Sequence, residues 1–355
     1  MRPLKSSIVV AAWPKDHNRH RQPYTHMLYR AVVAAAPRLK VLGYRPTRLP
    51  PRADLVHVHW PDTTLGHPNP WLAWVLTLRT LILLYVFRLR GALVVWTAHN
   101  LSGHNAENRR FLAAVYWWVF SRLVDGVICP SNWVKNSLQG RLSTLPQTVI
   151  PIGAGEEYRD VERARQRAHK DGMRSDDKRE DGAVRFGFVG RLSPYKGLES
   201  LIDAFMARAD PKDTLTIAGD PYTANYQNAL LERSSGDPRI DIRFGLIATC
   251  DFLEEIASLD VMCLPYRDIG HSGVALSSLA VGTPVVTFPV GAMPELQDSV
   301  GEEWVYLVRR SLIDDWDLIR SWQQASMSRG SPSLPNWEDI GRTTAAFYQA
   351  LLSVG

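Results

Sequence analysis

The sequence has few cysteines, and none of them are paired. Its 355 residues include only Cys129, Cys250 and Cys263, whose spacing matches neither a zinc site nor a disulfide framework. We expect buried structural thiols in a reducing compartment. A signal-peptide core is also missing, because the apolar run that begins at Ile8 has only five residues and no small-residue cleavage site follows it. The sequence therefore predicts a protein that stays in the cytoplasm.

Lysine is scarce, providing 8 of the 41 basic side chains while arginine provides 33. Arginine favours planar, bidentate contacts with phosphate. The net charge is +5, but the basic residues are spread along the chain and do not form one stripe with aromatic platforms, so no nucleic-acid partner is expected. The composition is 45% hydrophobic and 22% charged, which excludes collagen, coiled coil and wholesale disorder.

The length predicts two domains, and each half alternates strands with helices. Strands are expected at 7–12, 53–60, 92–97, 125–129, 184–189, 214–218, 240–244, 261–264 and 284–287, and helices at 24–36, 71–90, 108–123, 198–207, 222–232, 251–258, 274–281 and 340–354. This order implies parallel, doubly wound α/β sheets. We expect a first domain at 1–160, a charged linker at 161–182, a second domain at 183–330 and a C-terminal helix within 331–355.

The segment 70–90 is almost continuously apolar. Arg79 lies at its centre, which disfavours a membrane span. Two alternatives stay open: a buried helix, or a helix that lies on an anionic membrane surface. In the second case Trp71, Trp74 and Tyr85 would lie at headgroup depth, and Arg79, Arg88 and Arg90 would meet anionic lipid.

The most informative stretch is Gly190-Arg-Leu-Ser-Pro-Tyr-Lys-Gly197, between an expected strand and an expected helix. Open α/β sheets bind ligands at the carboxyl ends of their strands, where Arg191 and Lys196 fall. Two cations on a glycine-bounded turn suit a pyrophosphate, since a guanidinium grips two oxygens and an ammonium supplies a point charge. The alternative is a structural turn with two solvated cations.

This stretch resembles the donor-binding signature of GT-B fold glycosyltransferases of family 4. Three later segments fit the same family in order and spacing: Asp260-Val-Met-Cys-Leu-Pro-Tyr266, Gly282-Thr-Pro-Val-Val286 and Gly291-Ala-Met-Pro-Glu295. The resemblance implies two Rossmann-like domains that face a cleft, with a C-terminal helix crossing back. It also implies that Arg191 and Lys196 hold the diphosphate of a nucleotide sugar and offset charge on the leaving group.

One departure from the family concerns its paired glutamates. Ile269 and Ser277 stand at those positions, and the surrounding sequence resembles a branch of the family with a Ser-Gly turn. Ser272, Gly273 and Val274 open a helix there, so their N–H groups can form an anion site. Ser272 can also act as an N-cap. In the family the second glutamate usually contacts the ribose of the donor, and Ser277 could only replace that contact weakly.

In the first half, His99 and His104 follow an expected strand. They lack a third ligand, so no metal site is expected. A donor-sugar contact or a proton-transfer role fits them better. The segments 57–61 and 96–101 resemble first-domain motifs of the same branch. Related sequences often carry an acid where this chain has Asn105, which makes Asp62 a further candidate base.

The remaining candidate contacts lie on loops or at helix starts. For the acceptor we expect Arg19, Gln22, Tyr24 and Asp62, and for the nucleotide Phe244, Leu246 and Glu295 in addition to the residues above. A solvated basic loop is the alternative for the first group. A plain helix-start carboxylate is the alternative for Glu295.

Together these features predict a metal-independent hexosyltransferase without a cofactor. Its co-substrate would be a GDP- or UDP-linked sugar, and its acceptor a lipid-linked sugar or glycan in polysaccharide or glycolipid biosynthesis. We expect a cytoplasmic protein, and the membrane alternative for 70–90 would make it peripheral on the inner face of the plasma membrane. Retention is the default of the family, and an inverting route with a histidine base stays open. The alternatives are a sugar-nucleotide epimerase or hydrolase of the same fold, and a catalytically silent partner subunit.

Overall fold

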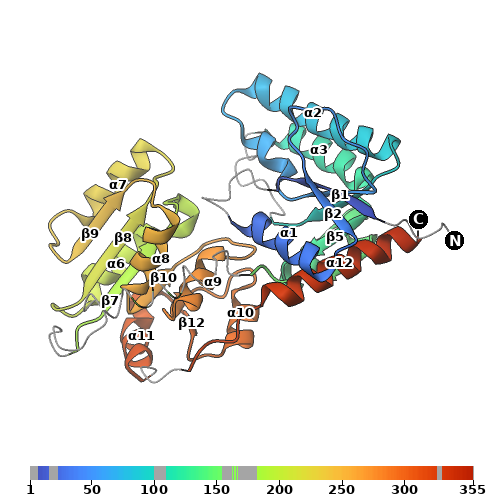
Figure 1. The fold of residues 1–355 in the computed structure, drawn as a ribbon. Helices are drawn as coiled ribbons and strands as arrows, with labels where there is room; N and C mark the ends of the chain where they lie inside the picture. The colour runs from blue at the N-terminus through green and yellow to red at the C-terminus, as the bar shows by residue number, and fades with distance from the viewer. Residues whose placement is uncertain are drawn as a thin grey trace. The chain divides into compact units, whose positions relative to one another are not determined.

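The computed structural model describes residues 7–15, 23–99, 109–153, 162, 164, 166, 182–325 and 330–354 (Figure 1). The chain divides into two compact units. Unit 1 comprises Met1–Gly153 with Pro335–Gly355, and unit 2 comprises Ala154–Leu334. Each unit is built on a six-stranded sheet in which all paired strands are parallel. The expected α/β class with two doubly wound sheets is confirmed.

The sheet of unit 1 has the order β2-β1-β3-β4-β5-β6. Its strands are β1 Ile8–Trp13, β2 Leu39–Gly43, β3 Leu55–Val58, β4 Leu93–Thr97, β5 Gly126–Cys129 and β6 Gln147–Val149. Its helices are α1 Tyr24–Ala35, α2 Pro70–Leu89, α3 Arg110–Leu123, α4 Asn132–Ser137 and α12 Trp337–Val354, with 3-10 turns η1 Pro61–Gly66 and η3 Gly140–Thr144. The helices that follow the strands cover both faces, as parallel sheets require.

The two faces of this sheet carry separate cores. Val95 of β4 packs with α1 and α12, whereas its neighbour Trp96 packs with α3. This follows from the pleat, because successive side chains of a strand point to opposite faces. Both faces are apolar, so the strands are continuous hydrophobic runs.

The C-terminal helix α12 packs against α1 on one face of the unit 1 sheet (Figure 1). Gly341 allows the close approach, because a Cβ at this position would lie 2.4 Å from the carbonyl carbon of Ala31. Ile340, Tyr348 and Leu351 of α12 are buried there. The last residues of the chain therefore complete the core of its first unit.

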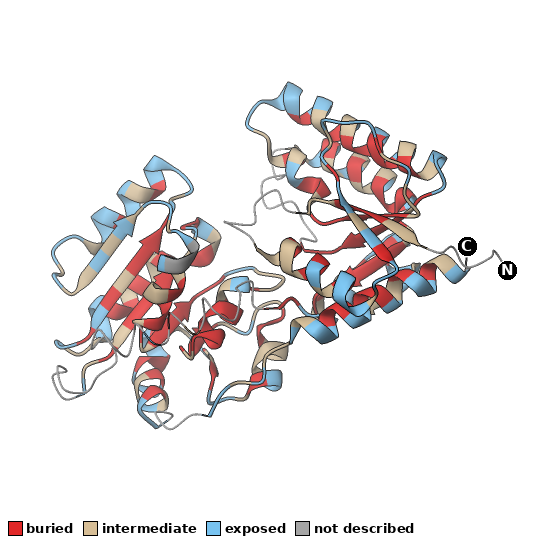
Figure 2. Ribbon diagram, viewed as in Figure 1, coloured by how far each residue is buried: buried red, intermediate tan, exposed pale blue. Residues whose placement is uncertain are grey.

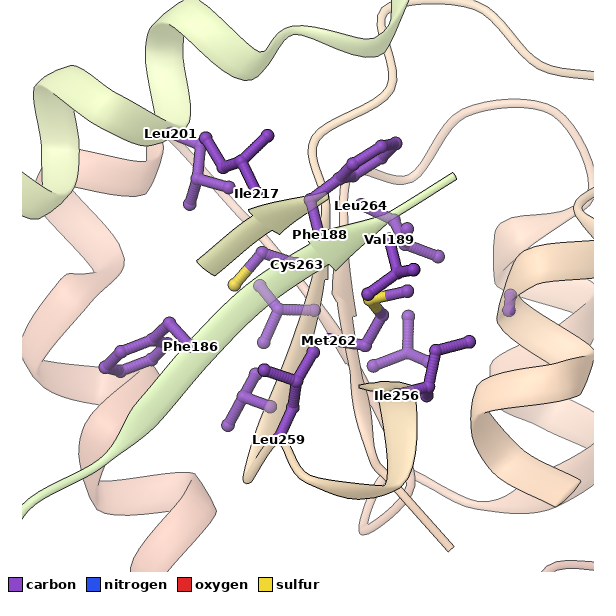
Figure 3. Packing of buried hydrophobic residues seen from close by; sticks show 14 of the residues in the cluster. Phe186, Phe188, Val189, Leu201, Ile217, Ile256, Leu259, Met262, Cys263 and Leu264 are labelled. Atoms are coloured by element: carbon purple, nitrogen blue, oxygen red, sulfur yellow. The ribbon is translucent and has the colours of Figure 1, made fainter. Parts of the chain in front are cut away.

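The sheet of unit 2 has the order β12-β11-β10-β7-β8-β9. Its strands are β7 Arg185–Val189, β8 Thr214–Gly219, β9 Ile240–Phe244, β10 Val261–Leu264, β11 Val285–Thr287 and β12 Val305–Leu307. Its helices are α6 Leu198–Arg208, α7 Ala224–Ser234, α8 Thr249–Ala257, α9 Gly273–Ala280, α10 Met293–Val300 and α11 Leu312–Ala325, with the 3-10 turn η5 Pro194–Lys196. Phe186, Phe188 and Met262 lie at the centre of its core (Figure 3).

The expected strands and helices are present, with ends that differ by three residues or fewer. The sequence did not predict the strands β2, β6 and β12, nor the helices α4, α10 and α11. Each of the three missed strands lies at an edge of its sheet. These strands are short and partly exposed (Figure 2). The strands β2 and β6 lack the apolar run that reveals a central strand, whereas β12 lies within the apolar run 304–308 and still escaped prediction. Cys129 and Cys263 are buried free thiols, as expected.

Candidate functional site

The loop after β7 carries the two cations that the sequence singled out. Gly190 follows the strand with a φ of 142°, Arg191 is exposed, and Lys196 is 6% exposed. Gly197 then adopts a φ of 68° at the start of α6. A Cβ on Gly197 would lie 2.2 Å from the carbonyl oxygen of Pro265, so the turn requires glycine. This loop turns Lys196 inward and leaves Arg191 at the surface.

Lys196 is a buried ammonium surrounded by aromatic rings. Its Nζ lies 5.2 Å from the ring centroid of Phe188 and 5.5 Å from that of Tyr266. In the described part of the chain, no carboxylate forms an ion pair with it. Burial, reinforced by the charge of Arg191, lowers the pKa of Lys196 from 10.5 to about 8. A buried cation that the protein does not neutralise favours a bound anion.

The N-terminus of α9 lies beside this ammonium. A Cβ built on Gly190 would lie 3.5 Å from Cγ2 of Val274 and 3.8 Å from Nζ of Lys196. The free N–H groups of a helix N-terminus and the helix dipole favour negative charge. The structure therefore brings together three features that were separate in the sequence, namely the glycine turn, the lysine and the Ser-Gly helix start.

Ser272 is the N-cap of α9. Its Oγ accepts a hydrogen bond from the Ala275 N–H at 3.1 Å and lies 3.0 Å from Oη of Tyr266. A side chain at Gly273 would meet nothing within 4 Å, so the helix start is open at this residue. Ser277 Oγ donates to the Gly273 carbonyl at 3.0 Å. The hydroxyl of Ser277 is thus used within its own helix, which weakens its case as a replacement for a glutamate.

The other predicted nucleotide contacts lie further along the same sheet edge. Phe244 ends β9, and Leu246 follows it with an exposed fraction of 66%. Glu295 lies in the first turn of α10, after β11. Because β9 and β11 lie on opposite sides of β7 in the sheet order, Phe244 and Glu295 flank the central strand from two directions.

Unit 1 contains a buried hydrogen-bonded network of three histidines that the sequence only partly revealed. Five atom pairs define it: Tyr348 Oη to His57 Nδ1 at 2.6 Å, His57 Nε2 to Thr97 Oγ1 at 2.7 Å, Tyr29 Oη to His57 Nδ1 at 3.0 Å, Tyr29 Oη to His59 Nε2 at 2.8 Å, and His59 Nδ1 to His99 Nε2 at 3.1 Å. We call this set the histidine network. Its histidines come from the carboxyl ends of β3 and β4, and Tyr348 comes from α12.

Burial keeps the inner histidines neutral. It lowers the pKa of His57 from 6.5 to about 3, and it lowers the pKa of His59 well below 6.5, helped by the neighbouring His57 and His99. A neutral imidazole has one donor and one acceptor nitrogen. The network therefore couples the proton positions of the three rings, because the nitrogen that donates in one ring determines the donor in the next, up to His99.

His99 lies at the outer end of the network between two aromatic rings. Trp60 stacks on it at a centroid distance of 4.6 Å and an interplanar angle of 20°. Tyr24 meets it edge-on at 5.2 Å, and Tyr24 also lies 5.9 Å from Trp337 of α12. The structure thus brings together His99 and Tyr24, which the sequence assigned to catalysis and to the acceptor.

The sequence pattern alone did not single out Tyr29, His59 or Tyr348 as parts of a site. A signal for His59 was present, because His57 and His59 alternate along one strand and therefore point to the same face. Tyr348 carries no such signal, since it lies 291 residues from His57. Only the packing of α12 on unit 1 reveals it.

Asp62 lies in the first turn of η1, directly after β3, and is 6% exposed. Burial raises the pKa of its carboxyl from 3.8 to about 6. The charge of Asp62 in turn contributes to a raised pKa of the buried Tyr116.

Arg19, Gln22 and His104 lie outside the described residues, as does most of 161–182. Within the residues that are described, no group of three or more His, Cys, Asp or Glu side chains is placed to hold a metal ion.

The geometry of unit 2 agrees with its sequence family. The family described as Glycosyl transferases group 1 matches residues 183–316, which span the lysine loop and α9. The solved structure of sucrose-phosphate synthase from Thermosynechococcus elongatus superposes with a TM-score of 0.66 at 17% identity, covering 98% of this chain and 100% of the other. The chain carries a glycosyl transferases group 1 domain on a GT-B fold.

Two further similarities involve sugar nucleotides. This GT-B chain is 26% identical over 301 residues to a GDP-mannose:glycolipid 4-beta-D-mannosyltransferase of Xanthomonas campestris pv. campestris, covering 84% of this chain and 79% of the relative. It also resembles Anabaena HepE solved in complex with UDP-glucose, with a TM-score of 0.61 and 14% identity, over 98% of this chain and 99% of that one.

Proposed function

We propose that this protein transfers a hexosyl group from a nucleoside diphosphate sugar to a glycolipid acceptor. The observation that carries the proposal is Lys196, a buried ammonium without a described acidic partner that lies beside the N-terminus of α9. A diphosphate supplies the negative charge that both features favour. The relative named above acts on GDP-mannose and a glycolipid, so we propose a GDP-linked mannose as donor.

The proposed division of labour follows the two units. Unit 2 binds the donor through Gly190, Arg191, Lys196 and the start of α9, with Phe244, Leu246, Ser277 and Glu295 near the nucleoside. Unit 1 binds the acceptor near His99, Tyr24 and Asp62, together with Arg19 and Gln22. In the proposed domain division, the charged segment 161–182 separates the acceptor-binding domain from the donor-binding domain. The boundaries 1–160, 183–330 and 331–355 are part of the proposal.

In the proposed reaction, a hydroxyl oxygen of the acceptor attacks the anomeric carbon. The bond from that carbon to the diphosphate oxygen breaks, and its electron pair leaves with the nucleoside diphosphate. Arg191 and Lys196 offset the charge that develops there, so the mechanism needs no metal ion. The acceptor proton passes to His99, with His104 and Asp62 as alternative bases.

The name of the relative specifies a β-linked product. Donors of this class carry mannose in the α configuration, so a β product requires inversion at the anomeric carbon. An inverting step needs a base on the acceptor side, and the ordered His99 of unit 1 is the group we propose for it. Because a glycolipid acceptor resides in a membrane, the enzyme would work at the inner face of the plasma membrane.

A donor panel with product analysis tests this proposal. Purified protein is incubated with GDP- and UDP-linked sugars and a detergent-solubilised glycolipid extract of the source cells, with and without a chelator. We expect GDP-mannose to be consumed, a β-linked glycolipid to form, and the chelator to have no effect. Lys196→Ala should abolish turnover, whereas Leu318→Ser, an exposed change on α11, should not.

Three outcomes of this panel contradict the proposal. Free mannose without a glycolipid product indicates a hydrolase, and a C2-epimerised sugar indicates an epimerase. Failure of the wild-type protein to consume any donor indicates a silent subunit.

A further inference from the structure

The helices α2 and α3 of unit 1 expose an unusual concentration of apolar side chains. Of the nineteen large hydrophobic side chains that are exposed in the described part of the chain, ten lie on these two helices. They are Trp71, Leu72, Trp74, Val75, Leu78, Ile82, Tyr85, Leu89, Phe111 and Trp118, which we call the α2–α3 outer face. The ring centroids of Trp74 and Phe111 lie 6.1 Å apart across the two helices. Exposed apolar side chains gathered in this way mark an interaction site.

The polarity of α2 is reversed relative to that of an ordinary surface helix. Its hydroxyl residues face the protein: Thr77 Oγ1 lies 3.0 Å from Thr64 Oγ1, and Thr80 Oγ1 donates to the Leu76 carbonyl. Its outward residues recur every three or four positions from Trp71 to Leu89, and all of them are apolar or aromatic. A helix that only covers a core places its polar residues outward.

The arginines of α2 and its C-cap are bonded within the protein. Arg79 donates to the Pro46 carbonyl, and Arg90 donates to the Pro50 carbonyl. Arg88 donates to the Leu123 carbonyl and pairs with Asp125. These contacts tie the three side chains to unit 1, so they do not favour the alternative in which Arg79, Arg88 and Arg90 meet anionic lipid. The outward surface of α2 is therefore apolar, not basic.

The charges around this face have one sign. Neither α2 nor α3 contains Asp or Glu. Arg110 and Arg122 are exposed at the two ends of α3, and the Arg122 guanidinium lies 3.8 Å from the ring centroid of Trp118. Tryptophan, tyrosine and arginine around an apolar stripe are typical of a membrane interface.

We infer that the α2–α3 outer face docks the protein on a lipid bilayer, with α2 lying in the membrane plane. The apolar side chains enter the acyl boundary, while Arg110 and Arg122 stay at headgroup depth. At about 1.5 Å per residue, the stripe from Trp71 to Leu89 that would lie along the bilayer surface is about 27 Å long. One third of the most apolar window of α2 is buried within unit 1, so the helix keeps its protein contacts while it docks. The inference rests on the proposed function, because a glycolipid acceptor requires access to a membrane surface.

We expect the burial of apolar side chains to drive docking, and this predicts how vesicle binding depends on lipid charge and salt. Binding to neutral phosphatidylcholine vesicles should occur, and 0.5 M salt should weaken it only slightly. Vesicles with one third phosphatidylglycerol should bind a few-fold more tightly at low salt, through the two arginines. A basic surface would show the opposite pattern, with no neutral-vesicle binding and a steep salt dependence.

Vesicle sedimentation of the full chain tests the inference. The triple variant Trp71→Ser, Leu78→Ser, Trp118→Ser should lose at least tenfold in partitioning to both vesicle types. The matched control Leu231→Ser, Leu318→Ser removes two similarly exposed leucines of unit 2 and should bind as the wild type does. An unchanged melting temperature for both variants shows that the loss is not unfolding.

GDP binding, measured by calorimetry on the same samples, separates this inference from the proposed function. Vesicle binding without GDP binding would contradict the proposed GDP-linked donor but would support the proposed docking surface. A wild-type protein that ignores both vesicle types, or a triple variant that binds them normally, overturns the docking surface. A dimer in solution that the triple variant dissociates, without any vesicle binding, assigns the face to a second copy instead.

Discussion

Tyr348 Oη lies 2.6 Å from Nδ1 of His57, although 291 residues separate them in the chain. Through His57, Tyr29 and His59, this contact joins the C-terminal helix to His99. Each imidazole in such a chain can donate at only one nitrogen, so the hydroxyl at one end constrains the proton position at the other. The last helix of the protein is therefore part of the candidate catalytic unit as well as of its core.

Tyr348→Phe should slow sugar transfer about tenfold, equivalent to about 1.4 kcal/mol, and leave donor KM unchanged. The variant keeps the ring but releases one constraint on His57, while Tyr29 remains in place. Unfolding in urea should show a loss of about 1 kcal/mol. A purely structural role would change stability without altering kcat or its pH profile.

The control for that experiment is Tyr85→Phe, the same chemical change at an exposed residue of α2. It should alter neither the rate on a detergent-solubilised acceptor nor the stability. If both tyrosine variants behave alike, the histidine network has no role in positioning His99.

Lys196→Met should weaken GDP binding about 100-fold, equivalent to about 2.7 kcal/mol. Urea unfolding should at the same time show equal or greater stability, because a buried charge is replaced by an apolar side chain of similar length. Calorimetry and denaturation on one preparation measure both. Lys212→Met, at an exposed lysine of the same unit, is the control and should leave GDP affinity unchanged.

GDP affinity should fall as the pH rises above about 8, where Lys196 loses its proton. The folded pKa lies below the usual 10.5, so between these values the unfolded chain holds the proton and the ligand-free folded chain does not. The unfolding free energy of the ligand-free protein therefore gains from this group as the pH rises through that window. The GDP affinity of the Lys196→Arg variant should stay constant from pH 7 to 9.5. If the GDP affinities of the wild type and the variant fall in parallel, Lys196 is not the group that titrates.

Asp62→Asn should stabilise the protein at pH 7 by up to about 3 kcal/mol. Burial raises the folded pKa of Asp62 to about 6, so the folded state holds its proton more tightly than the unfolded state. The contribution of this group therefore declines as the pH rises from about 4 to 6, and the variant should match the wild type at pH 4. Thermal unfolding as a function of pH measures the difference.

The same variant separates the candidate bases. His99→Gln should cost at least 100-fold in transfer rate, whereas Asp62→Asn should stay within about threefold of the wild type. The reverse result would assign the base to Asp62.

Gly341→Val should destabilise unit 1 by about 3 kcal/mol, because its side chain would overlap the backbone of Ala31 in α1. Chemical denaturation measures the loss. Gly330→Ala places a methyl group where nothing lies within 4 Å, and it should be neutral. Equal stability of both variants would show that α12 does not pack tightly on α1.

The central strands and most helices could be predicted because apolar runs and helical periodicity are local properties. The run Phe186–Val189 and the pattern of 198–207 show this, and so does the glycine turn between Gly190 and Gly197. The edge strand β2 escaped prediction, since its mostly exposed residues leave no such run, whereas β12 escaped prediction although the run 304–308 is apolar. The sequence left open whether the arginines of 70–90 meet lipid, because it does not show which carbonyls a long side chain reaches.

The α/β class, the two sheets, the Arg191–Lys196 loop and the Ser-Gly start of α9 could be read from the sequence, since each depends on residues that are close in the chain. The three-dimensional packing was needed to show that Lys196 is buried next to α9, that Tyr348 reaches His57, and that α2 turns its threonines inward and its tryptophans outward. Burial depends on which distant segments cover a side chain, and composition does not encode it. Lysine is scarce in this chain, and one of its eight lysines is the buried ammonium of the candidate donor site.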